Sequence, residues 1–228
     1  MPNLRLMIKV KAVFHESLGV PMSRLLIGFA TFATVSCGLT VPAFAEAENI
    51  NPPTQTYAGP IIGFDSVVAG DDYGASSGNG VTYGGVLGVS APTGAHARVG
   101  LEAEVDGSSA SRRGTFDGYT GKLSAGRDLF IGARLGYMIA PRVETYFKAG
   151  YTNAHFSVHG TDASGDKASY GQNFGGFRVG AGVGLSLDKV QFRLEYRFSD
   201  YGKLKIDGYD TGVTGTRHQV VLGATYPL

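Results

Sequence analysis

The feature of this sequence that most constrains its fold is a strict alternation of apolar and polar residues. It is clearest from Val190 to Tyr201, which reads VQFRLEYRFSDY: apolar or aromatic residues alternate with Gln, Arg, Glu, Arg and Ser. Successive side chains of a β-strand point to opposite faces, whereas a helix would spread these charges around its circumference. We therefore predict a strand with one apolar and one polar face.

The same alternation, in weaker forms, recurs along the chain and predicts eight antiparallel strands. They are Tyr57–Ser66, Val81–Ser90, His96–Asp106, Leu129–Ile139, Val143–Phe156, Phe177–Leu187, Val190–Tyr201 and Arg217–Leu228. A tilted strand of about ten residues is long enough to cross a bilayer. After Ala45, no apolar run is long enough to form a transmembrane helix.

The links between these strands alternate in length. Short links fall at Ala91–Ala95, Ala140–Arg142 and Asp188–Lys189, and long polar links fall at Val68–Gly80, Gly107–Lys122, Ser157–Gly176 and Gly202–Thr216. Transmembrane barrels combine short periplasmic turns with long outer loops. A soluble up-and-down barrel would also alternate, with its apolar face inside, so the alternation by itself leaves both architectures open.

The charges on the polar faces favour the membrane barrel. Six basic residues stand against five acidic ones, among many glycines: Arg98, Arg134, Lys148, Arg178, Arg193 and Arg197 against Glu102, Glu104, Asp106, Glu144 and Glu195. The interior of an eight-stranded barrel is only wide enough for side chains, so these charges can pair there while glycines leave room. Facing lipid, each basic group would cost about 2–4 kcal/mol at the midplane. We predict an all-β, eight-stranded, up-and-down transmembrane barrel with a filled lumen.

The first 45 residues predict export. A short positive start at Arg24 is followed by the uncharged stretch Leu25–Ala45, which ends in small residues just before Glu46. This pattern is typical of a cleaved signal peptide. We expect residues 1–45 to be the leader and signal peptide, cleaved after Ala45, and residues 46–228 to be the barrel. Either Met1 or Met22 can be the start.

Several stretches resemble the small outer-membrane β-barrel family of opacity-type and OmpA/OmpX-like proteins, and above all alphaproteobacterial surface barrel proteins. They are GGVLGV at Gly84–Val89, GLEAEVDGS at Gly100–Ser108, Ala133–Phe156, Val179–Gly202 and the terminal RHQVVLGATYPL. The resemblance implies a surface-exposed structural or interaction protein in the cell outer membrane, often labelled a porin. It also implies contact with outer-membrane lipids and lipopolysaccharide, and with the barrel-assembly machinery. Family members typically end in an aromatic residue, whereas this chain ends in Leu228 after Tyr226 and Pro227.

One motif raises the hypothesis of an enzyme. His155-Phe156-Ser157 resembles the His-x-Ser element of lipid A deacylases, and alternation places His155 and Ser157 on the lipid-facing side near the outer rim. A nucleophile also needs a base and an orienting carboxylate. The deacylase family has a glutamate about a dozen residues further on, and here no glutamate occurs between Glu144 and Glu195. We predict that the protein is not an enzyme and has no catalytic residues.

The remaining polar groups give weaker indications. Asp71-Asp72 and the pair Asp162 and Asp166 lack metal-loop spacing, so we predict no metal or cofactor. With a net charge of +1 and no basic run, we expect no nucleic acid as partner. Arg112-Arg113 could contact lipopolysaccharide phosphates from an outer loop, but a solvated loop tip is the simpler interpretation. The tyrosines expected in aromatic girdles at the membrane interfaces are Tyr57, Tyr83, Tyr151, Tyr196 and Tyr226.

The sequence therefore favours a non-enzymatic surface barrel whose four long loops meet host, phage or neighbouring envelope components. The alternatives are a narrow, low-conductance porin-like channel and a lipid A hydrolase. The loop sequences do not identify a ligand, because loops of this kind vary while the barrel is retained.

Overall fold

The computed structural model describes residues 51–71, 74–116, 119–161, 167–206 and 209–228. Its nine β-segments are β1 (Gln55–Asp71), β2 (Gly74–Pro92), β3 (Ala97–Ser108), β4 (Ser111–Phe116), β5 (Tyr119–Ala140), β6 (Val143–Thr161), β7 (Lys167–Leu187), β8 (Val190–Ile206) and β9 (Tyr209–Pro227). Among these residues, no helix is both long and apolar enough to span a membrane. The signal peptide expected at residues 1–45 lies outside the described residues.

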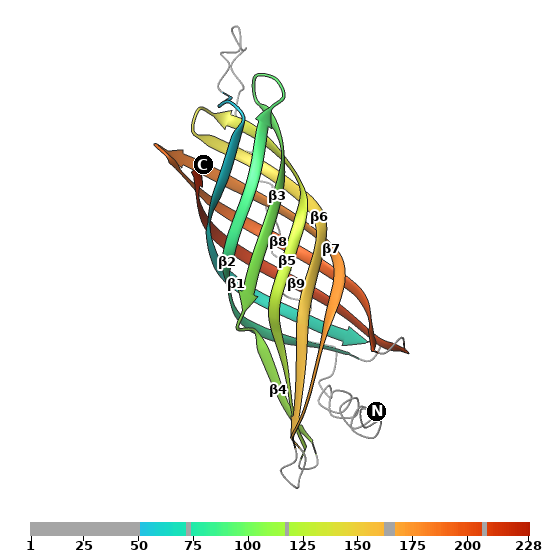
Figure 1. The fold of residues 1–228 in the computed structure, drawn as a ribbon. Helices are drawn as coiled ribbons and strands as arrows, with labels where there is room; N and C mark the ends of the chain where they lie inside the picture. The colour runs from blue at the N-terminus through green and yellow to red at the C-terminus, as the bar shows by residue number, and fades with distance from the viewer. Residues whose placement is uncertain (1–50, 72–73, 117–118, 162–166, 207–208) are drawn as a thin grey trace, which may run out of the picture.

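The nine segments close into a ring of eight antiparallel strands (Figure 1). β1 pairs with β2 on one side and with β9 on the other, which joins the two ends of the chain. β3 and β4 pair with successive parts of β5, so together they form one strand of the barrel, interrupted at Ser109–Ala110. Each other strand pairs with its neighbours in the sequence. The prediction of an eight-stranded up-and-down barrel is confirmed.

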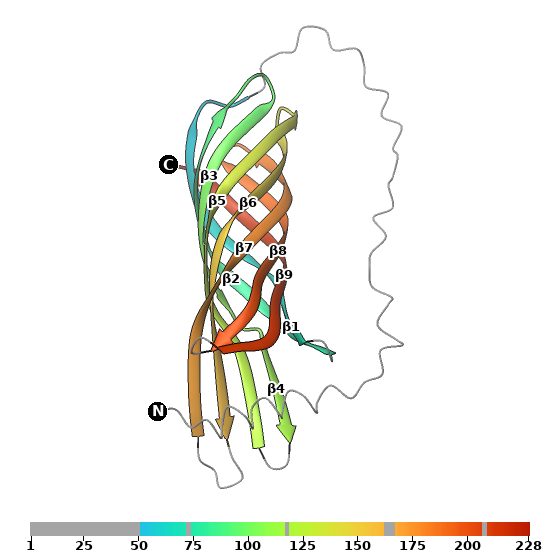
Figure 2. The ribbon, with the colours of Figure 1, turned by 90° about the vertical axis from the view of Figure 1, so that its right-hand side faces the viewer.

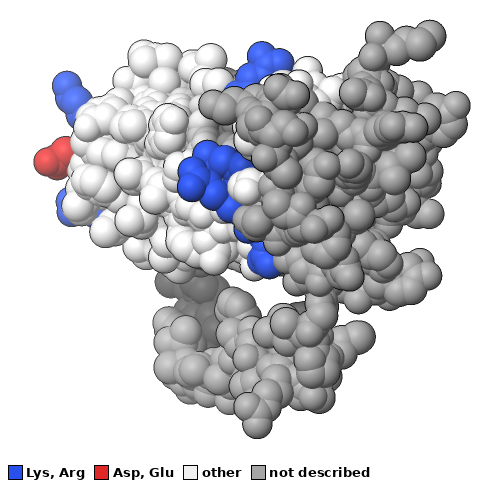
Figure 3. All heavy atoms as spheres, turned by 90° about the horizontal axis from the view of Figure 1, so that it is seen from below, with Lys and Arg blue, Asp and Glu red and all other residues white. Residues whose placement is uncertain are grey.

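The burial of alternate residues shows which face lies inside. In β8, Arg193, Glu195 and Arg197 are at most 4% exposed, whereas Leu194 and Tyr196 are about half exposed. On the face that Figure 3 shows, the described surface is mostly uncharged. A soluble barrel would show the opposite pattern, with charged residues outside. The structure is thus an outer-membrane type of barrel, with an apolar outer wall and a polar interior.

The predicted strands were too short at one end of the barrel. The segments expected as long loops are mostly continuations of the strands: β1 runs to Asp71 and β6 to Thr161, and their hairpin partners resume at Gly74 and Lys167. The alternation disappears from these extensions because, beyond the membrane, neither face has to be apolar. Backbone hydrogen bonding still continues there and keeps the strands paired.

The hairpins at this end differ in length (Figure 2). β4–β5 and β6–β7 extend well beyond β1–β2 and β8–β9 and form one protruding sheet of four strands. The opposite end has only short turns, as the sequence predicts. One of them is Asp188-Lys189, where Asp188 adopts a left-handed backbone with φ of 50°, a conformation that Asp tolerates better than most residues. By the rule for such barrels, the short turns face the periplasm.

Candidate functional site

The barrel interior holds a group of charged side chains, which we call the ionic core. It contains seven basic and seven acidic residues, each at most 5% exposed: Arg98, Arg134, Lys148, Arg178, Arg193, Arg197 and Arg217, with Asp65, Glu102, Glu104, Asp106, Asp128, Glu144 and Glu195. The eleven residues predicted from the polar faces all belong to it. The charges balance, as is required where water cannot screen an unpaired ion.

Lys148 of β6 lies at the centre of the ionic core. Its Nζ is 2.9 Å from Glu102 Oε1 and 2.7 Å from Glu195 Oε1, and it also forms an ion pair with Glu104. These three carboxylates lie close enough together to hold a metal ion. The ammonium group within ion-pair distance of all three supplies the positive charge that a metal would otherwise bring.

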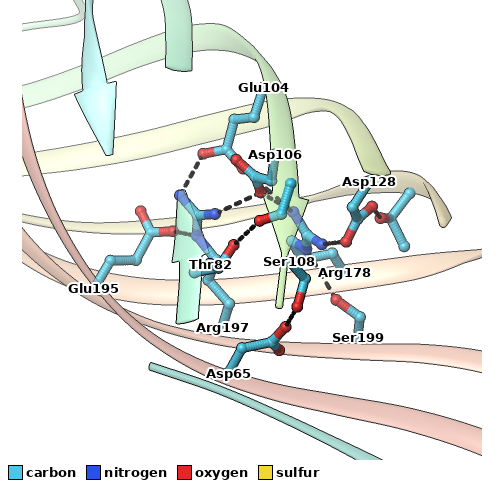
Figure 4. Close-up of polar contacts among 12 residues, drawn as sticks. Asp65, Thr82, Glu104, Asp106, Ser108, Asp128, Arg178, Glu195, Arg197 and Ser199 are labelled. Carbon is cyan, nitrogen blue, oxygen red and sulfur yellow. Dashed lines mark hydrogen bonds and ion pairs between the residues drawn. The ribbon is translucent and has the colours of Figure 1, made fainter. Parts of the chain in front are cut away.

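Two arginines, Arg178 and Arg197, join further carboxylates to the ionic core (Figure 4). Arg197 contacts Glu195 Oε1 at 2.5 Å, Glu104 Oε1 at 2.8 Å and Asp106 Oδ2 at 3.1 Å. Arg178 forms an ion pair with Asp128 and donates to Ser199 Oγ at 2.9 Å. Four strands, β3, β5, β7 and β8, contribute to these contacts, so the ionic core ties together segments that lie far apart in the sequence.

Three members of the ionic core were missed by sequence reasoning. Arg217 of β9 binds Asp65 of β1 through two hydrogen bonds, of 2.8 and 2.6 Å, and Asp128 of β5 at 2.7 Å. This cluster fastens the two ends of the chain where the barrel closes. Asp65 sits among glycines and apolar residues, and Asp128 lies beside a register shift in β5, so neither belongs to a visible alternation.

Two tyrosines complete the interior near the short turns. Tyr57 donates to Glu102 Oε2 at 2.8 Å and Tyr146 to Glu195 Oε2 at 2.7 Å. The placement of Tyr57 in an outer aromatic girdle was therefore wrong. The inner face of β1 is too poor in polar residues to reveal which way it points.

Inward glycines give these rings space. A Cβ at Gly182 would lie 2.6 Å from the ring of Tyr146, and a Cβ at Gly88 would meet the ring of Tyr57. The glycines thus make room, as predicted, but at these positions for tyrosine rings rather than for arginines. The other four girdle tyrosines, Tyr83, Tyr151, Tyr196 and Tyr226, face outward and are about half exposed.

Beyond the ionic core, towards the protruding sheet, the lumen becomes apolar. We call this cluster the apolar inner layer; it consists of Val67, Ala110, Ala125, Ala154, Phe156 and Tyr201, with Leu123 and Phe174 packed against them. The ring centroids of Phe156 and Tyr201 are 5.6 Å apart in an edge-on arrangement. Tyr201 also donates to Asp128 Oδ2 at 3.2 Å, which joins the two regions.

At the short-turn end the lumen widens into a cavity of about 350 Å³, which we call the vestibule. Its inner wall is formed by Tyr57, Arg134 and Glu144, and the turn residues Arg142 and Lys189 line its rim. Arg134 and Glu144 are held together by two hydrogen bonds, of 2.9 and 3.0 Å. The interior is thus open at this end, filled by charges in the middle, and lined by apolar side chains at the other end.

The histidine proposed for hydrolase chemistry contacts an amide. His155 and Ser157 alternate with the buried Ala154 and Phe156 and so face outward, as predicted. The Nδ1 of His155 lies 2.9 Å from the amide Oδ1 of Asn173, so the imidazole is oriented by an amide rather than by a carboxylate. The side chains of Asp71, Asp72, Asp162 and Asp166 lie outside the part of the chain whose side chains are described.

The outward face of the protruding sheet carries a row of basic residues that only the strand register reveals. Arg113 of β4 lies directly opposite Lys122 of β5, which lies opposite His159 of β6. Directly opposed residues have Cβ atoms about 5 Å apart. Arg112, which the sequence analysis paired with Arg113, points to the other side and donates to the carbonyl of Ser77 at 3.0 Å.

Comparison with known proteins identifies a family and several similar solved structures. The family model described as outer membrane protein beta-barrel domain matches residues 31–226. Neisserial surface protein A is 16% identical, with a TM-score of 0.48, over 78% of this chain and 100% of that one. Ail, the attachment invasion locus protein of Yersinia pestis, is 14% identical over 75% and 99%, with a TM-score of 0.44. The outer membrane protease OmpT from Escherichia coli is 11% identical over 77% and 96%, with a TM-score of 0.42. A comparison with curated sequences gives no match.

Proposed function

We propose a function from one premise: this chain belongs to the outer membrane protein β-barrel domain family, and its place is the cell outer membrane. In our proposal it is a non-enzymatic, surface-exposed structural and interaction protein. Its contacts are made by the hairpins that extend beyond the barrel, and its lumen carries no solute. The observation that carries this proposal is the filled interior, in which fourteen buried charges are paired or hydrogen-bonded.

The protruding sheet offers a surface suited to protein contacts. β7 pairs with β6 from Lys167 to Leu185, but its pairing with β8 ends at Phe177. Among the described residues, the stretch Gly171–Gly176 of β7 therefore has a paired strand on only one side. Such an edge presents backbone N–H and C=O groups that can pair with an added strand. We infer that it accepts an extended segment of an external protein, bound through its backbone.

A peptide experiment tests this mode of binding. Extended peptides selected from a random library on the refolded protein should bind through main-chain hydrogen bonds. Alternate backbone amides of an extended peptide point to opposite sides, and N-methylation removes them as donors. We expect methylation of the amides that face β7 to abolish binding, and methylation of the other set to leave it unchanged. Binding that is unaffected by methylation of either set would contradict strand addition.

The basic row supports lipopolysaccharide as a second partner. Arg113 and His159 are exposed, and they lie with Lys122 on the outward face of the sheet, beyond the apolar wall. Phosphate groups are bound well by arginine and lysine donors. We expect Arg113→Gln with Lys122→Gln to weaken binding of purified lipopolysaccharide. A matched pair at the opposite end, Arg142→Gln with Lys189→Gln, should leave it unchanged; equal effects of the two pairs would contradict a local site.

The two alternatives have less support. If the barrel were a channel, its solute would have to pass both the ionic core and the apolar inner layer. A hydrolase of the lipid A deacylase kind would need a carboxylate to orient His155, which instead contacts Asn173. We expect Ser157→Ala to leave the lipid A acylation pattern of the host cell unchanged; a pattern that depends on Ser157 would establish the enzyme.

A further inference from the structure

The vestibule at the periplasmic end differs from the ionic core in its charge balance. Its lining includes four basic residues, Arg98, Arg134, Arg142 and Lys189, but only two acidic ones, Glu144 and Asp188. The ionic core as a whole has equal numbers of basic and acidic residues. A concave site lined by one sign of charge, with low-dielectric walls, concentrates ions of the opposite sign. The vestibule is therefore attractive to anions.

Arg98 is the clearest source of this excess charge. Its guanidinium donates only to uncharged oxygens: Ser90 Oγ at 3.0 Å, the Ser90 carbonyl at 3.1 Å, and the carbonyls of Pro52 and Pro53 at 2.6 and 3.3 Å. Within the described part of the chain, no carboxylate forms an ion pair with it. Arg98 thus holds the start of the barrel chain against the wall while keeping its full positive charge.

The other lining groups suit an organic ligand rather than a bare ion. Glu144 is already paired with Arg134, and it also accepts from Gln191 Nε2 at 3.0 Å. The rest of the lining includes both apolar and polar side chains, among them Met138, Val190, Ser186 and Thr225. A volume of about 350 Å³ lies at the lower end of the range for small-molecule sites.

We propose that the vestibule binds a small organic carboxylate from the periplasm, such as the C-terminal end of a short peptide. The carboxylate lies between the rim cations Arg142 and Lys189 and is attracted by Arg98 behind them. The apolar lining contacts the rest of the ligand. This inference goes beyond the proposed outward function and does not depend on it, because the two sites lie at opposite ends of the barrel.

Calorimetric titration of the whole refolded chain in detergent micelles tests the proposal. The probes are acetyl-Ala-Ala with a free carboxylate, its C-terminal amide, and inorganic phosphate, each at low salt. We expect the free acid to bind with one-to-one stoichiometry and the other two to bind more weakly. No binding of the acid, or equal binding of the acid and the amide, would overturn the proposal. Phosphate binding as tight as that of the acid would overturn the assignment to an organic ligand.

Rim variants locate the site. Arg142 and Lys189 are exposed turn residues, so their replacement leaves the barrel intact, which heat-dependent gel mobility checks. Arg142→Gln with Lys189→Gln should weaken binding of the acid about fivefold, as expected for two partly exposed charges. The single variant Arg127→Gln, which removes an exposed arginine of β5 outside the vestibule, should change nothing. An undiminished affinity in the rim double variant would contradict this location.

Discussion

The ionic core and the apolar inner layer fill the same lumen with opposite chemistry. The ionic core lies where the outer wall is apolar and includes fourteen buried charges, whereas the apolar inner layer lies further out and includes Phe156, Phe174 and Tyr201. Charges suit the first region because its apolar face must turn to lipid, which leaves the polar face inside. Beyond the lipid, the outside can be polar, so the interior can pack apolar side chains as a soluble protein does. The difference marks where the membrane environment ends.

The largest expected loss of stability follows a substitution at the centre of the ionic core. Lys148→Met leaves Glu102, Glu104 and Glu195 without their shared cation. Removing one partner of a buried ion group costs about 3–5 kcal/mol, because the remaining charges stay uncompensated. Urea unfolding of the refolded protein in detergent measures the loss. Lys122→Met in the protruding sheet is the control, and an equal loss in both variants would show that burial of the charge is irrelevant.

A smaller loss of stability is expected from a substitution in the apolar inner layer. Phe156→Ala removes a ring packed against Phe174 and Tyr201 and leaves a cavity, which costs about 3 kcal/mol. Unlike the loss in the ionic core, this one should not be relieved by protonating carboxylates. Unfolding measured at pH 7 and at pH 4 separates the two: the cost of Lys148→Met falls at low pH, and the cost of Phe156→Ala does not. The same pH response in both variants would remove the distinction.

The smallest loss of stability is expected at Tyr146, where the ionic core meets the vestibule. Tyr146→Phe keeps the ring that Arg134 covers at 4.0 Å but removes the hydroxyl that donates to Glu195. A hydrogen bond to a charged group contributes about 1.5–3 kcal/mol, and we expect the low end because Glu195 keeps Lys148 and Arg197 as partners. Outward Tyr83→Phe is the matched control, with no expected change. A null result at Tyr146 would mean that the ion pairs alone hold Glu195 in place.

The comparison also explains how far the sequence could predict the structure. In β8, Arg193, Glu195 and Arg197 alternate with apolar residues that face lipid, so the strand, its faces and its place in the core were all visible. In the outer part of β6, Ala154 and Phe156 face inward, while His155 and Ser157 face outward. No constraint from lipid acts there, and from Ser157 on the continuing strand was predicted as a loop.

Register was the other missing information. The row of Arg113, Lys122 and His159 depends on which residues oppose one another across three strands. A register shift between Ala125 and Asp128 changes the face to which later residues point. Turn geometry and bulges fix such shifts, and they leave little trace in an alternation pattern. The same holds for Arg98, whose partners include carbonyls of a segment outside the predicted strands.

The central claim is that the ionic core and the apolar inner layer block the lumen, so that no solute crosses the barrel. Liposome swelling tests this most directly, with refolded protein in the bilayer and a disaccharide as the solute. The ionic core and the apolar inner layer together predict swelling no faster than in liposomes without protein. Rapid swelling would contradict a blocked lumen and would favour the function of a channel.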